Sequence, residues 1–230
     1  MFRQRTWFSY GIILIQVLLF VAAIGISVQS SFPAVSLRGI FTPSFESLYR
    51  LGMGGAIPWK MGRWWTVGTG PYLHGSLLHL VFSILWLGMI TPLVISLFGP
   101  GRFFIIYSMS GVGGALVTIL AGTPFFVGAS GAILGLFGAL IYYGSHEGGT
   151  FGTTLFKVTV VFSLLAFLYG FITPGVDNWG HLGGLATGIL AAFLVGYRDS
   201  GLSYRLGKIL VWICCLGMIT SFSLMIYFLL

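Results

Sequence analysis

One serine lies among glycine, alanine and aliphatic residues in the stretch FFVGASGAILG, which spans residues 125–135. Ser130 stands between Ala129 and Gly131 and follows Gly128 by two residues. A serine hydroxyl is a weak nucleophile until a base takes its proton, and near pH 7 a neutral imidazole is the usual base. The flanking glycines leave room for a carbonyl group to approach the backbone. This stretch predicts a nucleophile that a substrate can reach and that needs a histidine.

The histidines supply candidates for that base. His74 and His79 lie in HGSLLH, and His181 lies in WGHLGG. A lone histidine on an apolar helix is usually a hydrogen-bonded core residue. Three histidines at the same membrane depth as one accessible serine indicate a functional site instead. The depth of the histidines in the membrane therefore decides between a core role and a functional site.

Carboxylates are not expected inside the apolar stretches. All four acidic residues fall in predicted loops: Glu46, Glu147, Asp177 and Asp199. The sequence therefore predicts no aspartyl-protease pair, no carboxylate proton relay and no acidic metal site. Asp177 precedes Trp179-Gly-His and is predicted to be the N-cap of a helix. The adjacent Cys214 and Cys215 are predicted to be apolar filling residues.

The composition is that of a membrane protein. Of 230 residues, 57% are hydrophobic and 7% are charged, whereas soluble domains carry about 25% charged residues. Seven apolar segments have the character of spanning helices: Trp7–Val28, Tyr72–Phe98, Arg102–Ala121, Ser130–Tyr143, Phe156–Ile172, Trp179–Tyr197 and Ile209–Leu230. Six are long enough to span, and the one that begins at Ser130 is short. The predicted fold is an all-α polytopic membrane protein, with the first segment as an uncleaved anchor.

The net charge of +7 sets orientation rather than nucleic-acid binding. With a cytoplasmic N-terminus, seven basic residues lie at cytoplasmic ends, as the positive-inside rule requires: Arg3, Arg5, Arg102, Lys157, Arg198, Arg205 and Lys208. The other four lie in a long first loop, residues 29–71, whose several Trp residues favour the membrane interface. We therefore expect no nucleic-acid partner, a lipid bilayer as surroundings and an external C-terminus.

This orientation places Ser130 and the three histidines at one membrane face. Small residues recur at helical spacing in the fourth segment (Gly131, Gly135, Gly138, Ala139) and in the sixth (Gly180, Gly184, Gly188, Ala192, Gly196). Such stripes let two helix backbones approach closely in lipid. His181 lies three residues before Gly184 and so shares the packing face. The pattern predicts that Ser130 and His181 arrive at the same depth, with free N–H groups at the start of the Ser130 helix to stabilise an oxyanion.

Four stretches resemble the rhomboid intramembrane serine proteases, and three of them carry the family motifs in the family's order along the chain. They are GASG at 128–131, DNWGHLGG at 177–184, HGSLLHLVF at 74–82 and GRFFIIYSMSGVGGAL at 101–116. The resemblance covers about residues 64–197. It implies a six-helix core, predicted here as residues 1–200, and an additional C-terminal transmembrane helix over residues 201–230.

The resemblance also implies a role for each site residue. Ser130 is the nucleophile and His181 the general base, while His79 and the Ser130 backbone N–H bind the oxyanion. Three further residues are assigned to the oxyanion and substrate side: Ser83, Gly128 and Ala129. His74 is structural, beneath the first loop. The implied reaction cleaves single-pass transmembrane proteins with water and no cofactor, and the expected location is a bacterial inner membrane.

The chain departs from the family pattern at three positions. Ser83 replaces the usual Asn, Thr66 follows Trp65 where an Arg is common, and Leu134 replaces an aromatic residue that often stacks on the catalytic histidine. A proteolytically silent relative that binds transmembrane clients is the alternative. A transporter or haem protein is disfavoured because His74 and His79, five residues apart, lie about 140° apart around a helix.

Overall fold

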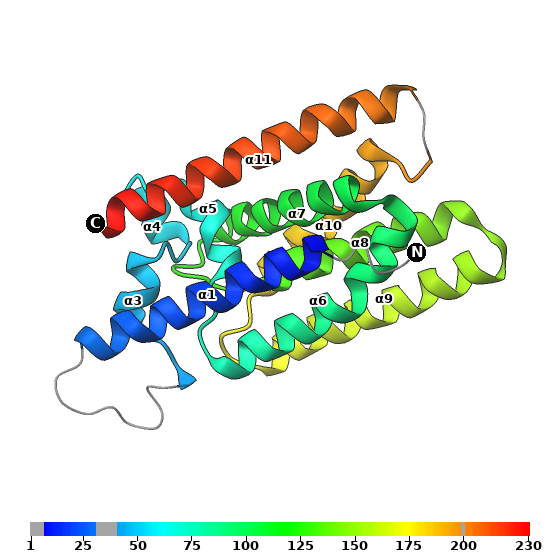
Figure 1. Cartoon of the computed structure of the whole chain (residues 1–230). Coiled ribbons are helices and arrows are strands. Elements are labelled where there is room, and N and C mark those ends of the chain that lie inside the picture. Colours follow the sequence, from blue (N-terminus) through cyan, green and yellow to red (C-terminus); the bar gives the residue numbers. More distant parts are fainter. Residues whose placement is uncertain (1–6, 31–40, 199–200) are drawn as a thin grey trace.

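The computed structural model describes residues 7–30, 41–198 and 201–230, and the regular elements in these ranges are helices (Figure 1). The long helices in the described part are α1 (Trp7–Ser30), α6 (Leu77–Phe98), α7 (Pro100–Leu120), α8 (Ser130–Glu147), α9 (Gly149–Ile172), α10 (Asn178–Val195) and α11 (Gly201–Leu229). Between α1 and α6 lie the short helices α3 (Phe45–Arg50), α4 (Ala56–Lys60), α5 (Thr66–Thr69) and the 3₁₀ turn η1 (Gly70–Tyr72).

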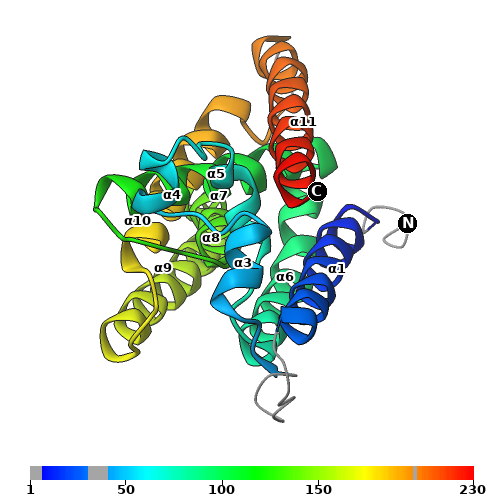
Figure 2. The ribbon, with the colours of Figure 1, turned by 90° about the vertical axis from the view of Figure 1, so that its left-hand side faces the viewer.

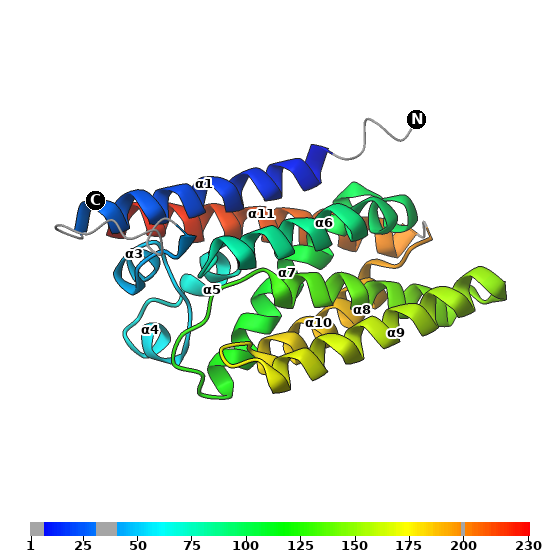
Figure 3. The ribbon, with the colours of Figure 1, turned by 90° about the horizontal axis from the view of Figure 1, so that it is seen from below.

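Within the described ranges, six helices are long and apolar enough to cross a membrane: α1, α6, α7, α9, α10 and α11. The predicted all-α polytopic membrane fold is therefore confirmed. The helix that begins at Ser130, α8, has 18 residues, the same length as α10, so the predicted shortness of this helix is wrong: only its apolar part is short, and the helix continues through a polar last turn to Glu147. It lies in the middle of the bundle, whereas α1 and α11 lie on the outside (Figures 2 and 3).

Helices α8 and α10 run parallel and touch through their backbones. A Cβ atom added to Gly184 would overlap the Gly131 carbonyl, and one added to Gly188 would overlap the Gly135 carbonyl. Glycine is required at such contacts because any side chain would force the helices apart. The predicted packing of the two small-residue stripes is confirmed within the helices, whereas Gly196 is the C-cap of α10 and lies outside the contact. The middle of α8 is enclosed by the bundle, and Leu136 is fully buried there.

The predicted start of the second apolar segment is wrong. Ser76 is the N-cap of α6, and its hydroxyl accepts a hydrogen bond from the His79 N–H at 3.1 Å. The helix therefore begins at Leu77, and Tyr72 belongs to η1. His74 lies in the turn before α6, so the 140° separation predicted from an unbroken helix does not apply.

Other predicted boundaries differ because hydropathy marks the apolar part of a helix and not its polar ends. Helix α9 begins at Gly149 rather than Phe156, and α11 begins at Gly201 rather than Ile209. At its other end α8 continues to Glu147, beyond the predicted Tyr143. The turns of α11 that the prediction omitted carry two basic residues, Arg205 and Lys208.

Two acidic residues predicted in loops lie in helices. Glu46 is in the first turn of α3, and Glu147 is the last residue of α8, where it pairs with Arg198 at 3.1 Å. Asp177 is the N-cap of α10, as predicted. Asp199 lies outside the described residues.

The described part of the first loop is folded rather than extended along an interface. Trp65 is 1% exposed and stacks on Phe228 of α11, with ring centroids 5.8 Å apart. Trp59 and Trp64 are exposed. Through α5 the loop also meets α11 at Gly68, where an added Cβ would contact the Ser221 side chain. The division into a core of residues 1–200 and a separate helix of residues 201–230 stays a prediction.

We predict that one methyl group at the α8–α10 contact destabilises the fold. Gly188→Ala places a Cβ against the Gly135 carbonyl and should cost about 1–3 kcal/mol. Gly88→Ala on α6 is the matched control, since nothing lies within 4 Å of its added Cβ. Thermal unfolding in detergent should show a lower Tm for Gly188→Ala alone; equal Tm values for the two variants would contradict the close contact.

Candidate active site

Ser130 is the first residue of α8. The N-cap, Ala129, is fully buried, and its side chain makes no capping hydrogen bond. The first helical hydrogen bond at this end runs from the Ile133 N–H to the Ala129 carbonyl at 2.9 Å. The N–H groups of Ser130 and the next residues therefore have no acceptor within the helix and carry the positive end of its dipole. A half-buried hydroxyl beside free N–H donors suits a nucleophile whose reaction creates an oxyanion.

The loop that leads into α8 is held by the first loop. Phe126 and Gly54 exchange two backbone hydrogen bonds, 2.8 and 3.2 Å long. Two residues later the Gly128 N–H donates to the Gly70 carbonyl at 3.2 Å. The Phe126 ring lies so close to Gly54 and Gly70 that an added Cβ at either would crowd it. The position of Ser130 thus depends on a segment more than fifty residues earlier in the chain.

Gly128 brings this loop directly against His79. Its φ is +128°, a conformation that L side chains rarely adopt. An added Cβ would lie 2.6 Å from the Cε1 atom and 2.7 Å from the Nε2 atom of the His79 ring. The backbone before Ser130 therefore packs on the His79 imidazole. Ser83 lies one turn further along α6 and is buried.

His181 lies in the first turn of α10 and is 4% exposed. Its Nδ1 atom is 3.2 Å from the Asn178 side-chain oxygen, and the Phe167 ring of α9 lies edge-on at a centroid distance of 6.0 Å. Asp177 caps the helix by accepting the Trp179 N–H at 3.1 Å and also accepts the Thr118 hydroxyl. The N-cap role predicted for Asp177 is confirmed.

Three glycines bring the surroundings of Ser130 and His181 together. An added Cβ on Gly131 would lie 3.0 Å from the Gly180 carbonyl oxygen, and one on Gly114 of α7 would lie 2.8 Å from the same atom. Gly131 directly follows Ser130, and Gly180 directly precedes His181. Ser130 and His181 therefore belong to two helices whose backbones are in contact at the same end of the bundle.

His74 packs beside this group without belonging to a helix. It is 1% exposed, and its ring centroid lies 5.0 Å from that of His79. The two rings are neighbours, contrary to the separation expected from helical spacing. Burial, followed by the nearby His79, lowers the pKa of His74 from 6.5 to about 3. In the described ranges, no three His, Cys, Asp or Glu side chains gather as metal ligands do.

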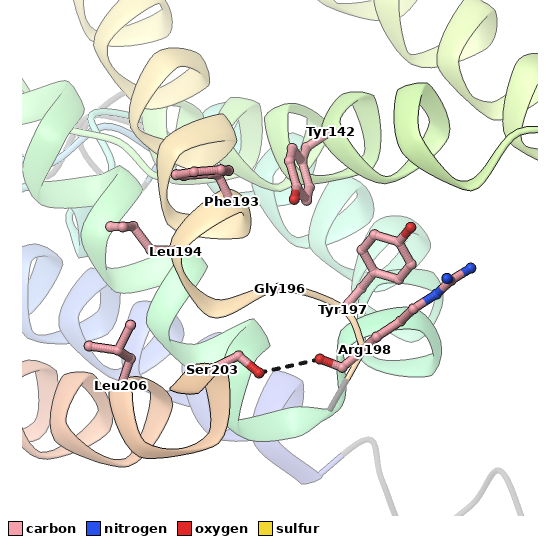
Figure 4. Close-up of a pocket in the computed structure, with 8 residues that line it drawn as sticks. All are labelled: Tyr142, Phe193, Leu194, Gly196, Tyr197, Arg198, Ser203 and Leu206. Carbon is pink, nitrogen blue, oxygen red and sulfur yellow. Dashed lines mark hydrogen bonds between the residues drawn. The ribbon is translucent and has the colours of Figure 1, made fainter. Parts of the chain in front are cut away.

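A cavity of about 350 Å³ lies at the opposite ends of α8 and α10 (Figure 4). It is lined by Tyr142, Phe193, Leu194, Gly196, Tyr197, Arg198, Ser203 and Leu206. Because α8 and α10 are parallel, and the lining residues Tyr142 and Phe193 each lie twelve residues beyond Ser130 and His181, this cavity is separated from the two by about two thirds of each helix. It does not include any predicted site residue.

The contacts of His181 were not foreseen from the sequence. Asn178 lies three residues before His181, a spacing at which side chains on one helix meet, so this pair was open to prediction. Phe167 lies on another helix and carries no comparable signal, because its place beside His181 depends on how α9 packs against α10.

Comparison with known proteins gives the class of this helical membrane protein. A family model described as the Rhomboid domain matches residues 61–198. The chain is 34% identical to rhomboid protease GluP of Bacillus subtilis over 140 residues, which are 61% of this chain and 28% of GluP. It is 32% identical to the putative rhomboid protease YdcA of the same organism over 135 residues, 58% of this chain and 68% of YdcA.

The chain belongs to the rhomboid family. A further relative is the inactive RHOMBOID-like protein 8 of Arabidopsis thaliana, 26% identical over 205 residues, which are 79% of this chain and 57% of that protein. Family membership therefore includes both proteases and a protein named as inactive, and the chain spans little more than a quarter of GluP.

We predict that His74 makes the protein sensitive to acid. Its pKa is about 3 in the folded protein and about 6.5 in an unfolded chain. The unfolded state thus binds the proton more readily, so this contribution to stability is complete above about pH 6.5 and is lost as the pH falls toward 3. The loss is at most about 5 kcal/mol.

His74→Phe keeps a ring and removes the titrating group. Its Tm in detergent should fall less between pH 7 and pH 4 than the Tm of the wild type. Parallel Tm curves for the two proteins would contradict a buried neutral His74.

Proposed function

We propose that the protein is an intramembrane serine endopeptidase with Ser130 as nucleophile and His181 as general base. The observation that best supports this is the contact of Gly131 with Gly180, which brings the starts of α8 and α10 together. A serine at a helix N-terminus and a buried histidine with its Nδ1 occupied by Asn178 then share one end of the bundle.

In the proposed reaction the Ser130 Oγ attacks a substrate carbonyl while His181 Nε2 takes the hydroxyl proton. The C–O bond forms and the carbonyl becomes a tetrahedral oxyanion. Its negative charge is stabilised by the Ser130 N–H and by His79, with Gly128 and Ala129 as the backbone on that side.

The intermediate collapses when the C–N bond breaks and His181 gives its proton to the leaving amine. Water, deprotonated by His181, then hydrolyses the acyl-enzyme and restores Ser130. Ser83 is proposed as a further polar group on the oxyanion side, one turn beyond His79. No cofactor takes part in these steps.

The proposed substrates are single-pass transmembrane proteins in the bilayer. A regular helix hides its carbonyl groups in hydrogen bonds, so cleavage is expected where glycine or another helix-weakening residue lets the segment unwind. A small side chain before the scissile bond is expected from the family resemblance.

A rhomboid-like protein that binds transmembrane clients without cutting them is the second candidate. The similarity to the inactive RHOMBOID-like protein 8 favours it, together with Ser83 and Leu134 at positions where the family usually has Asn and an aromatic residue. The presence of both Ser130 and His181 favours the protease.

We predict that a fluorophosphonate probe labels the wild-type protein in detergent and labels neither Ser130→Ala nor His181→Ala. Cleavage of a transmembrane model substrate should follow the same pattern, with losses of at least about 10³-fold. Asp177→Asn is the control, because Asn still caps α10 and the proposed site has no carboxylate. It should label at nearly the wild-type rate.

Labelling of Ser130→Ala at the wild-type rate would exclude Ser130 as the nucleophile. Loss of labelling in folded Asp177→Asn would replace the dyad by a triad. A wild-type protein that binds a transmembrane substrate but neither labels nor cuts would support the non-cutting candidate.

The proposed orientation places the N-terminus in the cytoplasm of a bacterial cell, in the inner membrane, with Ser130 at the outer face. It is supported by the end of the bundle opposite Ser130, where the Arg102 side chain donates to the Arg198 carbonyl and Arg198 pairs with Glu147. We predict that reporter domains fused after Tyr197 are cytoplasmic and that those fused after Leu230 are external. An external reporter after Tyr197 would reverse the topology.

A further inference from the structure

Helix α9 is linked to the candidate base in two ways, directly through the Phe167 ring and indirectly through Asn178 of α10, although it is the least enclosed of the helices around the site. Only 11% of its apolar span is buried, against 44% for α10, and it lies on the outer side of α8 and α10 (Figure 2). We propose that α9 positions the His181 imidazole, through an amide bridge formed by Asn178 and an edge contact from Phe167. This proposal rests on the proposed function of His181 as base.

The amide bridge joins two helices. The Asn178 Nδ2 donates to the Phe167 carbonyl of α9 at 3.2 Å, and the Asn178 Oδ1 lies 3.2 Å from His181 Nδ1. A carbonyl only accepts hydrogen bonds, so the amide nitrogen must face Phe167 and the amide oxygen must face His181. The orientation of Asn178 therefore follows from its partner on α9.

The direction of the amide fixes the tautomer of the histidine. An amide oxygen only accepts, so His181 carries its proton on Nδ1 and donates it to Asn178. Nε2 is then left with a free lone pair, which is the form that a general base needs. Asn178 thus gives the imidazole the orientation that a carboxylate supplies in a Ser-His-Asp triad, without adding charge.

Phe167 supplies the aromatic contact that α8 lacks. Its ring meets the His181 ring at 86° with centroids 6.0 Å apart, within the range of edge-to-face pairs. Position 134 on α8, where the family pattern favours an aromatic residue, is a buried leucine. The ring that limits rotation of His181 therefore comes from α9, on the same residue whose carbonyl receives Asn178.

Gly170 makes room for the bridge. It lies one turn after Phe167 on α9, and an added Cβ would overlap the Asn178 Oδ1. The amide of Asn178 can therefore reach α9 only if this residue is glycine. Phe167, Gly170 and Asn178 form one unit that we name the His181 support.

Nuclear magnetic resonance of ¹⁵N-histidine-labelled protein in detergent tests the support independently of activity. Wild-type His181, assigned by comparison with His181→Ala, should show a protonated Nδ1 and an unprotonated Nε2. Asn178→Leu and Gly170→Ala should give a mixture of tautomers. An unchanged spectrum in folded Asn178→Leu would overturn the proposal.

The rate of fluorophosphonate labelling, measured as a function of pH, is the second readout. We expect at least about a tenfold loss for Asn178→Leu and Gly170→Ala, as part of the 10²–10⁴ that a positioned base contributes, and a smaller loss for Phe167→Leu. Phe171→Leu, one turn further along α9 and 79% exposed, is the matched control and should label like wild type. The proposal would be overturned if Phe167→Leu and Asn178→Leu were both labelled at the wild-type rate.

The two experiments separate this proposal from the proposed function. A wild-type protein that never labels contradicts the protease, while the histidine spectra still decide whether Asn178 holds His181. If Asn178→Leu does not fold, Phe167→Leu and Gly170→Ala provide the same comparison from α9.

Discussion

The contact of the α8 backbone with the α10 backbone is the constraint on which the rest of the structure depends. Lipid offers no hydrophobic gain for packing two apolar helices, so their association relies on close van der Waals approach. Glycines 131, 135, 184 and 188 permit that approach, because each added side chain would meet a carbonyl of the other helix. Since the helices are parallel, the contact also sets which residues share a depth. Ser130 and His181 lie at the same end of the two helices because Gly131 and Gly180 beside them are in contact.

The remaining parts of the site are held from outside this pair. The first loop fixes the entry to α8 through Phe126 and Gly128, and α9 fixes the ring of His181 through Asn178. Neither support is covalent or charged. Both use backbone carbonyls as acceptors, which are available at every turn of the chain and cost no desolvation of an ion. The close glycine contact thus lies at the centre of the site, and the hydrogen bonds from the first loop and α9 lie at its edge.

Much of this could be predicted from the sequence, for physical reasons. The start of α8 at Ser130 and the N-cap at Asp177 follow from local chemistry, and the helix pairing follows from the period of the glycines. The position of His74 could not be read from hydropathy, because apolar residues continue through a turn; the capping role of Ser76 marks the true helix start. The contact of Phe167 with His181 depends on tertiary packing alone, so no spacing in the sequence indicates it.

The helices α6, α8 and α10 all begin at the end of the bundle where Gly128 meets His79. His79, Ser130 and His181 each lie in the first turn of one of them. The polar residues of the candidate site are thereby confined to one end of the bundle, which we call the rim. No helix has to be broken in mid-membrane, where each unpaired backbone group costs several kcal/mol. The point at which α8 begins has its own consequence. One more helical turn before Ser130 would place the N–H groups of Ser130 and the next residues in intrahelical hydrogen bonds, so the residue at which this helix starts decides whether the rim has free backbone donors beside the serine.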